Sequence, residues 1–159
     1  MCGIAGFVDG RHGGAASGLE ERARAMNQAL RHRGPDDGGV WTDTETGVAL
    51  ANRRLAVRDL SQAGHQPMVS DDGRLVLTYN GEIYDTGELR AALEAAGRRF
   101  RGGSDTEVLL HACAEWGVAE TVSRCNGMFA FALWDRFEPR LTLARDRLGI
   151  KPLYWVRAD

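Results

Sequence analysis

The sequence of 159 residues predicts an α+β fold with antiparallel sheets, and three observations support this prediction. Strand patterns occur near both ends of the chain, with helical patterns between them. The last strand patterns follow one another through short connections, which suit antiparallel neighbours. The length fits one domain, and no repeat or low-complexity segment interrupts it. We therefore expect residues 1–159 to form one domain.

The N-terminal half predicts three strands and one helix. The apolar run at residues 2–8 predicts a strand, and the glycines of residues 9–18 predict a loop. Residues 19–31 place apolar side chains at helical spacing. Two further strands are predicted at residues 48–57 and 75–79, with a long loop between them. Both sheets can therefore begin to form in this half of the chain.

The C-terminal half predicts two longer helices, a brief helix and three strands. One helix begins near Thr86, and Gly97 supplies its stop. Ser104 and Glu107 have the spacing of a capping box for the next helix, which is expected to end at Gly117. The remaining patterns predict the brief helix and the strands at residues 118–124, 127–135, 140–146 and 153–156.

Composition and charge exclude several classes of protein. Lys+Arg 20 against Asp+Glu 22 gives a net charge of -2, whereas nucleic-acid and membrane-surface binders usually carry a basic excess. No apolar run approaches the ~20 residues that span a bilayer, and the first residues lack a secretory signal pattern. We expect a cytoplasmic protein with no nucleic-acid or membrane partner.

The three cysteines do not form a recognised pattern. Cys2, Cys113 and Cys125 are odd in number and lack the CxxC spacing of zinc sites. A disulfide framework is not expected from such spacing. We therefore expect no bound metal, and each cysteine has to be interpreted on its own.

Cys2 is the first candidate for chemistry. If Met1 is removed, as is usual before a small residue, Cys2 carries a thiol and an α-amine together. The unperturbed α-amine has a pKa of about 8, so it can accept the thiol proton at cytosolic pH. The alternative interpretation is a small buried thiol that packs like alanine. The nucleophile hypothesis therefore also needs oxyanion donors and substrate-binding groups.

The stretch YNGEIY supplies candidate donors for a tetrahedral oxyanion. It follows the predicted strand that ends at Tyr79. Asn80 offers a side-chain amide, and Gly81 offers a backbone N–H without a Cβ beside it. An ordinary Asn-Gly turn is the alternative interpretation, although a predicted helix follows rather than a second strand.

Two charged residues could together recognise an α-amino acid. A guanidinium such as that of Arg54 grips a carboxylate through two parallel hydrogen bonds. Asp105, at the start of a predicted helix, could bind an ammonium group. Taken separately, Arg54 could be a surface charge, and Asp105 could simply stabilise the helix N-terminus.

Several stretches carry a resemblance to one enzyme family, and they occur in the family's order: MCGIAGF, RHRGPDDGG, NRRLAVRDLS, GHQPM, YNGEIY, GGSDTEVLL, NGMFAFALWD and LARDRLGIKPLYW. The sequence resembles the N-terminal glutaminase domain of glutamine-hydrolysing asparagine synthetase, an N-terminal-nucleophile amidotransferase. CGI alone is shared with other such amidotransferases, whereas RHRGPD, GHQPM and the last stretch are more specific. The resemblance spans nearly the whole chain and implies a four-layer αββα sandwich.

The resemblance also implies roles for individual residues. Cys2 matches the nucleophile, and Asn80 and Gly81 match the oxyanion hole. Arg54 matches the arginine that binds the substrate carboxylate. The remaining glutamine-binding positions match Leu55, Ala56, Val57, Arg58, Glu82 and Asp105. The loop from residue 31 to residue 35 is expected to shape the pocket rather than to react.

The activity implied by the resemblance is hydrolysis of glutamine to glutamate and ammonia, without a cofactor. The ammonia would pass to a synthetase domain, in cis or in trans, that uses ATP and Mg to make asparagine from aspartate. That domain lies outside this sequence, so synthetase activity is not expected from it. The sequence is expected to end before the family's glutaminase domain is complete, and a homodimer remains open.

Two departures and two alternatives remain. Arg58 replaces a usually apolar residue, and Asp85 stands where the family commonly has asparagine. A glutaminase domain that serves another ammonia acceptor is one alternative. The other is a noncatalytic fragment or partner-binding module, in which the Cys2 thiol would be dispensable.

Overall fold

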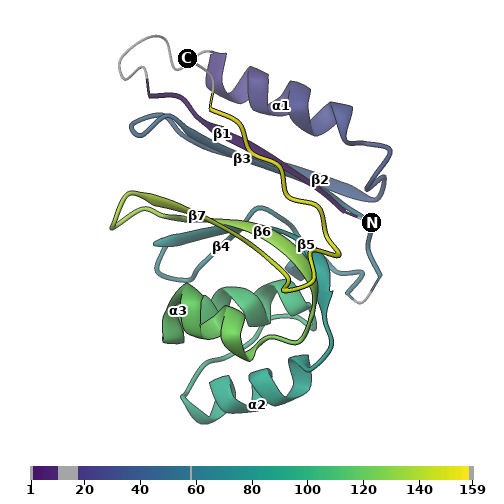
Figure 1. Cartoon of the computed structure of the whole chain (residues 1–159), viewed down its shortest axis with the longest axis vertical. Coiled ribbons are helices and arrows are strands. Elements are labelled where there is room, and N and C mark those ends of the chain that lie inside the picture. The colour runs from purple at the N-terminus through teal and green to yellow at the C-terminus, as the bar shows by residue number, and fades with distance from the viewer. Residues whose placement is uncertain (1, 11–17, 58, 158–159) are drawn as a thin grey trace.

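The computed structural model describes residues 2–10, 18–57 and 59–157, which form four layers. Helix α1, a first sheet, a second sheet and the helices α2 and α3 follow one another in space (Figure 1). The first sheet has the order β1-β3-β2 and the second β4-β5-β6-β7, with antiparallel pairing throughout. The fold is therefore the αββα sandwich, which confirms the predicted fold class.

The helices and strands have these bounds. The first sheet and its helix comprise β1 Gly3–Val8, α1 Leu19–Ala29, β2 Asp37–Asp43 and β3 Val48–Arg54. The rest of the chain comprises the 3-10 helix η2 Gln62–Gly64, β4 Met68–Val69, β5 Leu75–Ile83, α2 Thr86–Ala95, α3 Asp105–Arg124, β6 Gly127–Asp135 and β7 Arg140–Arg145.

Apolar residues on both faces of the central strands produce the layers. On β5, Leu75 and Leu77 pack toward the helices, whereas the intervening Val76 packs toward the first sheet. This alternation follows from the period of two along a strand. The cluster between the sheets contains Val48, Leu50, Val76, Ala132 and Trp134. Because both faces of β5 are apolar, the strand must be covered on both sides.

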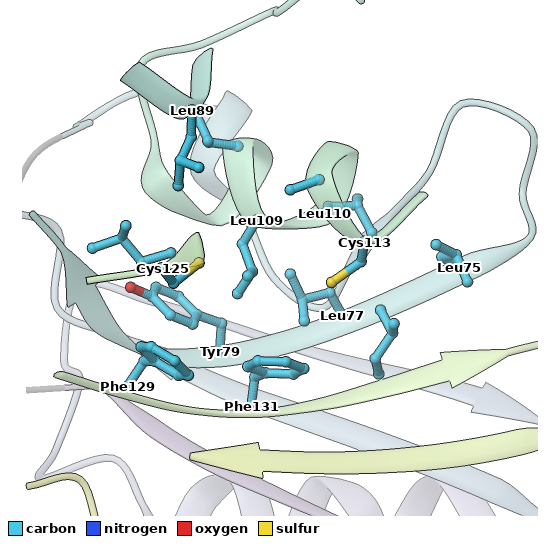
Figure 2. Close-up of a cluster of buried hydrophobic side chains, with 14 of the residues drawn as sticks. Leu75, Leu77, Tyr79, Leu89, Leu109, Leu110, Cys113, Cys125, Phe129 and Phe131 are labelled. Atoms are coloured by element: carbon cyan, nitrogen blue, oxygen red, sulfur yellow. The ribbon is translucent and has the colours of Figure 1, made fainter. Parts of the chain in front are cut away.

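The largest buried cluster lies between the second sheet and α3. Figure 2 shows the rings of Phe129 and Phe131 beneath side chains of the helices. These two rings are stacked with centroids 6.0 Å apart. The helix residues that close the cluster include Leu89, Leu93, Val108, Leu109, Leu110 and Ala112. This cluster anchors the start of α3 against β5.

Several predicted bounds change in the structure. β5 continues to Ile83, so the prediction that this strand ends at Tyr79 is wrong. Its last residues stay in the strand because β6 pairs with them as far as Ile83. Gly117 breaks α3 with φ 77 and ψ 164, so the predicted stop and the brief helix after it both occur within one merged element. The Ser104 side chain caps α3 by accepting from Glu107 N, as predicted.

Three other predictions of strands or loops were incomplete. β2 and β4 lie in segments for which no strand was predicted, because glycine and proline dominate their patterns. The predicted strand at residues 153–156 is wrong, since these residues pair with no strand. Tyr154 and Trp155 are there 90% and 78% exposed. Most of the predicted loop at residues 9–18 lies outside the described residues.

Candidate functional site

A cavity of about 160 Å³ lies where the start of β1, the ends of β3 and β5 and the start of α3 meet. Most of the predicted site residues line it, namely Cys2, Arg54, Leu55, Val57, Asn80, Gly81, Glu82 and Asp105. Ala56 is not among the lining residues, and Arg58 lies outside the described residues. Residues that are far apart in the sequence therefore converge on one site.

The Cys2 thiol lies against the chain that leaves β3. Its Sγ accepts a hydrogen bond from Leu55 N at 3.4 Å and lies 3.8 Å from Leu55 O. β1 places it there because Gly3 pairs with Arg53 of β3. Cys2 is half-buried, so its sulfur is held by backbone yet remains reachable. An N–H directed at sulfur provides a hydrogen bond to a thiolate.

The backbone N–H of Gly81 is directed away from β6. The N–H groups of Tyr79 and Ile83 donate to side chains at the outer edge of β5, to Gln66 Oε1 at 2.7 Å and Asp105 Oδ2 at 3.2 Å. Phe129, opposite Gly81, instead exchanges hydrogen bonds with Asp146. Alternate N–H groups of a strand point the same way. The Gly81 N–H therefore points to the edge that borders the cavity.

Glycine is required at position 81 by a close approach of β6. A Cβ built there would lie 2.5 Å from Met128 O and 2.6 Å from Phe129 Cβ. Asn80 beside it is 6% exposed and also lines the cavity. The two predicted oxyanion donors thus lie on a paired strand rather than in a turn.

Arg54 organises the loop that follows β3. Its Nη1 donates to Ser61 O at 3.0 Å and its Nη2 donates to Asp59 O. Gly64 packs against the guanidinium, where a Cβ would clash. A guanidinium has five N–H donors, so these contacts leave donors for a carboxylate. Arg54 is 8% exposed and borders the cavity.

Asp105 is the first residue of α3 and brings a negative charge to the cavity. Its Oδ2 accepts from the Tyr79 hydroxyl at 2.8 Å and from Ile83 N at 3.2 Å. Burial, followed by the Asp105 carboxylate, raises the pKa of Tyr79 far above its usual value. The phenol therefore stays protonated and acts as a donor. Arg54 and Asp105 present opposite charges to one cavity.

Asp59 joins the two loops that border the cavity. Its Oδ1 accepts from Ser61 N at 2.8 Å, and its Oδ2 accepts from Gly103 N at 2.9 Å. Hydrogen bonds from Ser61 and Gly103 lower the pKa of the Asp59 carboxyl. The loop after β3 and the loop before α3 are thus connected by one carboxylate, which sequence reasoning did not identify.

Gln66 and Lys151 are two further lining residues that sequence reasoning missed. Gln66, 3% exposed, donates through Nε2 to Thr106 Oγ1 at 3.2 Å and accepts from Asn52 Nδ2 at 3.1 Å. The GHQPM motif could have identified Gln66, because a buried amide between sheets has a defined role. Lys151 is 3% exposed, and no local pattern predicts a buried lysine, since lysine is mostly exposed.

The loop between α1 and β2 holds the cavity wall in place. Its Gly34 O accepts from Arg53 Nε at 3.0 Å, and its Asp36 Oδ2 accepts from Ala56 N at 2.9 Å. These contacts fix the chain on either side of Arg54. They agree with the prediction that this loop shapes the pocket.

The described residues were also searched for metal sites and membrane spans. Within residues 2–10, 18–57 and 59–157, no group of three or more His, Cys, Asp or Glu side chains is arranged to hold a metal ion. No described helix combines the length and apolar character needed to cross a membrane. The chemistry of the cavity is therefore considered through its thiol, amide and charged groups.

Comparisons with known proteins identify similar chains. The family model described as a glutamine amidotransferase domain matches residues 1–159. The chain is 42% identical over 159 residues to asparagine synthetase [glutamine-hydrolyzing] 3 of Bacillus subtilis (strain 168), with 99% of this chain and 25% of that protein covered. It is 37% identical over 171 residues to putative asparagine synthetase [glutamine-hydrolyzing] 2 of Methanocaldococcus jannaschii, with 98% and 32% covered.

A solved structure has a similar fold. Glutamine phosphoribosylpyrophosphate amidotransferase from B. subtilis, complexed with ADP and GMP, superposes with a TM-score of 0.68. The similarity covers 90% of this chain and 37% of that chain, at 24% sequence identity. This chain spans about a quarter to a third of the length of the asparagine synthetases it matches.

Proposed function

Because the chain belongs to the glutamine amidotransferase domain family, we propose that it hydrolyses the side-chain amide of glutamine to glutamate and ammonia. One observation carries the proposal. A thiol, a backbone N–H donor, an arginine and an aspartate line the same cavity, at Cys2, Gly81, Arg54 and Asp105. A nucleophile, an oxyanion donor and a pair of amino-acid-binding charges are the groups that this reaction needs.

The reaction begins with removal of Met1, which frees the α-amine of Cys2. The amine accepts the thiol proton, and the sulfur attacks the amide carbon of glutamine. Asn80 Nδ2 and Gly81 N–H donate to the oxygen that becomes negative. The C–N bond then breaks, and the leaving nitrogen takes the proton from the α-ammonium of Cys2 as ammonia. A glutamyl thioester remains on the sulfur.

Water completes the reaction. The α-amine of Cys2 accepts a proton from water, whose oxygen attacks the thioester carbon. The C–S bond breaks, glutamate leaves, and the proton returns to the sulfur. The amine thus serves as base in both halves, as is general for N-terminal nucleophiles.

Charge complementarity selects an α-amino acid as substrate. The guanidinium of Arg54 binds the α-carboxylate, and the carboxylate of Asp105 binds the α-ammonium. Glu82 and the backbone of residues 55–58 complete the binding site. The side-chain amide of the substrate then extends toward Cys2 and Gly81.

The ammonia passes to a synthetase domain, in cis or in trans, that uses ATP and Mg to make asparagine. The asparagine synthetases that this chain resembles support this part of the proposal. The glutaminase step itself takes no cofactor. A downstream sequence that encodes a different acceptor-modifying domain would redirect this part of the proposal without changing the first reaction.

Release of glutamate from glutamine tests the first reaction. We expect Cys2→Ala to abolish release, because no other group in the cavity replaces the sulfur in the thioester. Cys113→Ala is the matched control, since it removes a buried thiol of the helix-packed cluster and should retain turnover. Glutamate release by Cys2→Ala at the rate of the unchanged protein would refute the mechanism.

A further inference from the structure

Tyr79 presents a polar atom at the boundary between the core and the cavity. Its side chain is 2% exposed and belongs to the cluster under α3. Figure 2 shows the ring beside Phe129 and Cys125, where packing fixes its position. Its hydroxyl nevertheless reaches Asp105 Oδ2 at 2.8 Å. The apolar core therefore holds a donor rigidly against a cavity carboxylate.

Two donors converge on the same oxygen of Asp105. Besides the Tyr79 hydroxyl, Ile83 N approaches Oδ2 at 3.2 Å. The two oxygens of a carboxylate are fixed in one plane, so holding Oδ2 also fixes the direction of Oδ1. Asp105 lines the cavity, and its helix position alone would leave several side-chain rotamers open. The pair of donors selects one orientation.

We propose that Tyr79 is a positioning residue for the Asp105 carboxylate and thereby sets the selectivity of the cavity for substrates with an α-ammonium group. This inference rests on the proposed function, in which Asp105 binds that ammonium. Tyr79 does not act on the amide that is cleaved. Its contribution is confined to the amino end of the substrate.

A substrate pair separates this role from a general structural one. Glutamine carries the α-ammonium, whereas 4-carbamoylbutanoate has the same amide and carboxylate without it. An oriented Asp105 contributes to kcat/KM for glutamine only. Removal of the Tyr79 hydroxyl should therefore lower kcat/KM for glutamine and leave that for 4-carbamoylbutanoate unchanged.

The experiment compares Tyr79→Phe with the unchanged protein on both substrates. We expect kcat/KM for glutamine to fall about tenfold, which corresponds to ~1.4 kcal/mol, mainly through KM. The selectivity for glutamine over 4-carbamoylbutanoate should fall by the same factor. Tyr154→Phe is the matched control, because Tyr154 is 90% exposed and the same atom is removed.

Two results would overturn the inference. One is an unchanged kcat/KM for glutamine in Tyr79→Phe, and the other is a parallel loss on both substrates, including loss through misfolding. In the double variant with Asp105→Asn, Tyr79→Phe should add no further loss of selectivity. If Asp105→Asn alone leaves selectivity unchanged, the assigned role of Asp105 fails, which is distinct from failure of Tyr79.

Discussion

Gly81 combines two demands at a single residue. The strand β6 passes so close that a side chain is excluded, and the N–H must point to the cavity. The sequence predicted Gly81 as a donor because of its missing Cβ. The close approach of Met128 and Phe129, which explains why glycine is needed, arises from strand pairing and could not be predicted locally.

Replacement of Gly81 by alanine tests this double demand. The added Cβ would meet Met128 O and Phe129 Cβ at 2.5 and 2.6 Å, so we expect a loss of about 1–3 kcal/mol in the free energy of unfolding. The N–H must also shift, and kcat for glutamine hydrolysis should fall about 100-fold. Urea unfolding and glutamate release measure the two effects.

Gly87→Ala provides the control for that substitution. No atom lies within 4 Å of a Cβ built at Gly87, in the first turn of α2. We expect unchanged activity and equal or slightly higher stability. If Gly81→Ala behaves in the same way, the assignment of the Gly81 N–H to the oxyanion is wrong.

Among single residues, chemical type decided what could be predicted. Cys2, Arg54 and Asp105 have side chains whose reactivity or charge is evident in the sequence, and the structure brings all three to one cavity. Gln66 and Lys151 also line it, but amide and ammonium groups have many roles. Their burial depends on packing between distant segments, which a linear pattern does not contain.

At the level of elements, two loops form the wall of the cavity and meet at Asp59. Arg54 holds the first loop through its carbonyl groups, and Glu107 holds the second by accepting from Arg101 N and Gly102 N at 2.7 and 2.9 Å. The Asp59 carboxylate connects the two. Arg54 and Asp105, at the ends of these loops, are thereby kept at a fixed separation.

Asp59→Ala should disconnect the loops without touching the sulfur. Because both amino-acid-binding charges would then move independently, we expect KM for glutamine to rise about tenfold, with kcat changed much less. Steady-state glutamate release gives both parameters. Asp72→Ala is the control, since Asp72 also accepts hydrogen bonds within a turn, from Ser70 Oγ and Arg74 N, but lies away from this cavity. An equal rise in KM for both variants would contradict the connection.

Elements differ in how far the sequence specifies them. The capped start of α3 and the break at Gly117 were predictable, because Ser104 and Gly117 act within their own turn. The end of β5 was not, because pairing with β6 keeps Asn80 and Gly81 in the strand. The segment at residues 153–156 has a strand composition but pairs with no strand, and β-propensity depends on such context.

For the whole molecule, the layers were more predictable than the convergence of the site. Apolar residues on both faces of β5 indicate coverage on both sides. By contrast, β3 lies between β1 and β2, and this order places Cys2 beside Leu55. A contact across 53 residues depends on strand order and register rather than on local pattern.

The stability of the whole molecule should depend on pH through His111. Burial lowers the pKa of His111 below its ordinary 6.5, with Arg98 and Arg101 adding to the effect despite the nearby Glu107 and Asp71. Below pH 6.5 the unfolded chain therefore binds more protons, and the free energy of unfolding decreases as pH falls. This loss ends once His111 is protonated in the folded state as well.

Urea unfolding between pH 7.5 and about 5 measures this dependence. His111→Phe keeps an aromatic ring beside Phe100, which now lies 5.0 Å from the imidazole centroid, and should reduce the slope. His32→Phe is the control, because His32 is exposed, and it should retain the slope. An unchanged slope in His111→Phe would contradict the assignment to this residue.

Intact-mass analysis with an electrophilic glutamine analogue tests the central claim most directly, since it reports the nucleophile and its α-amine together. We predict one covalent adduct, located by peptide mapping on Cys2 of chains that lack Met1, and slower labelling when glutamine is present. A fully active protein that retains Met1, or an adduct that forms equally well in Cys2→Ala, would contradict the account.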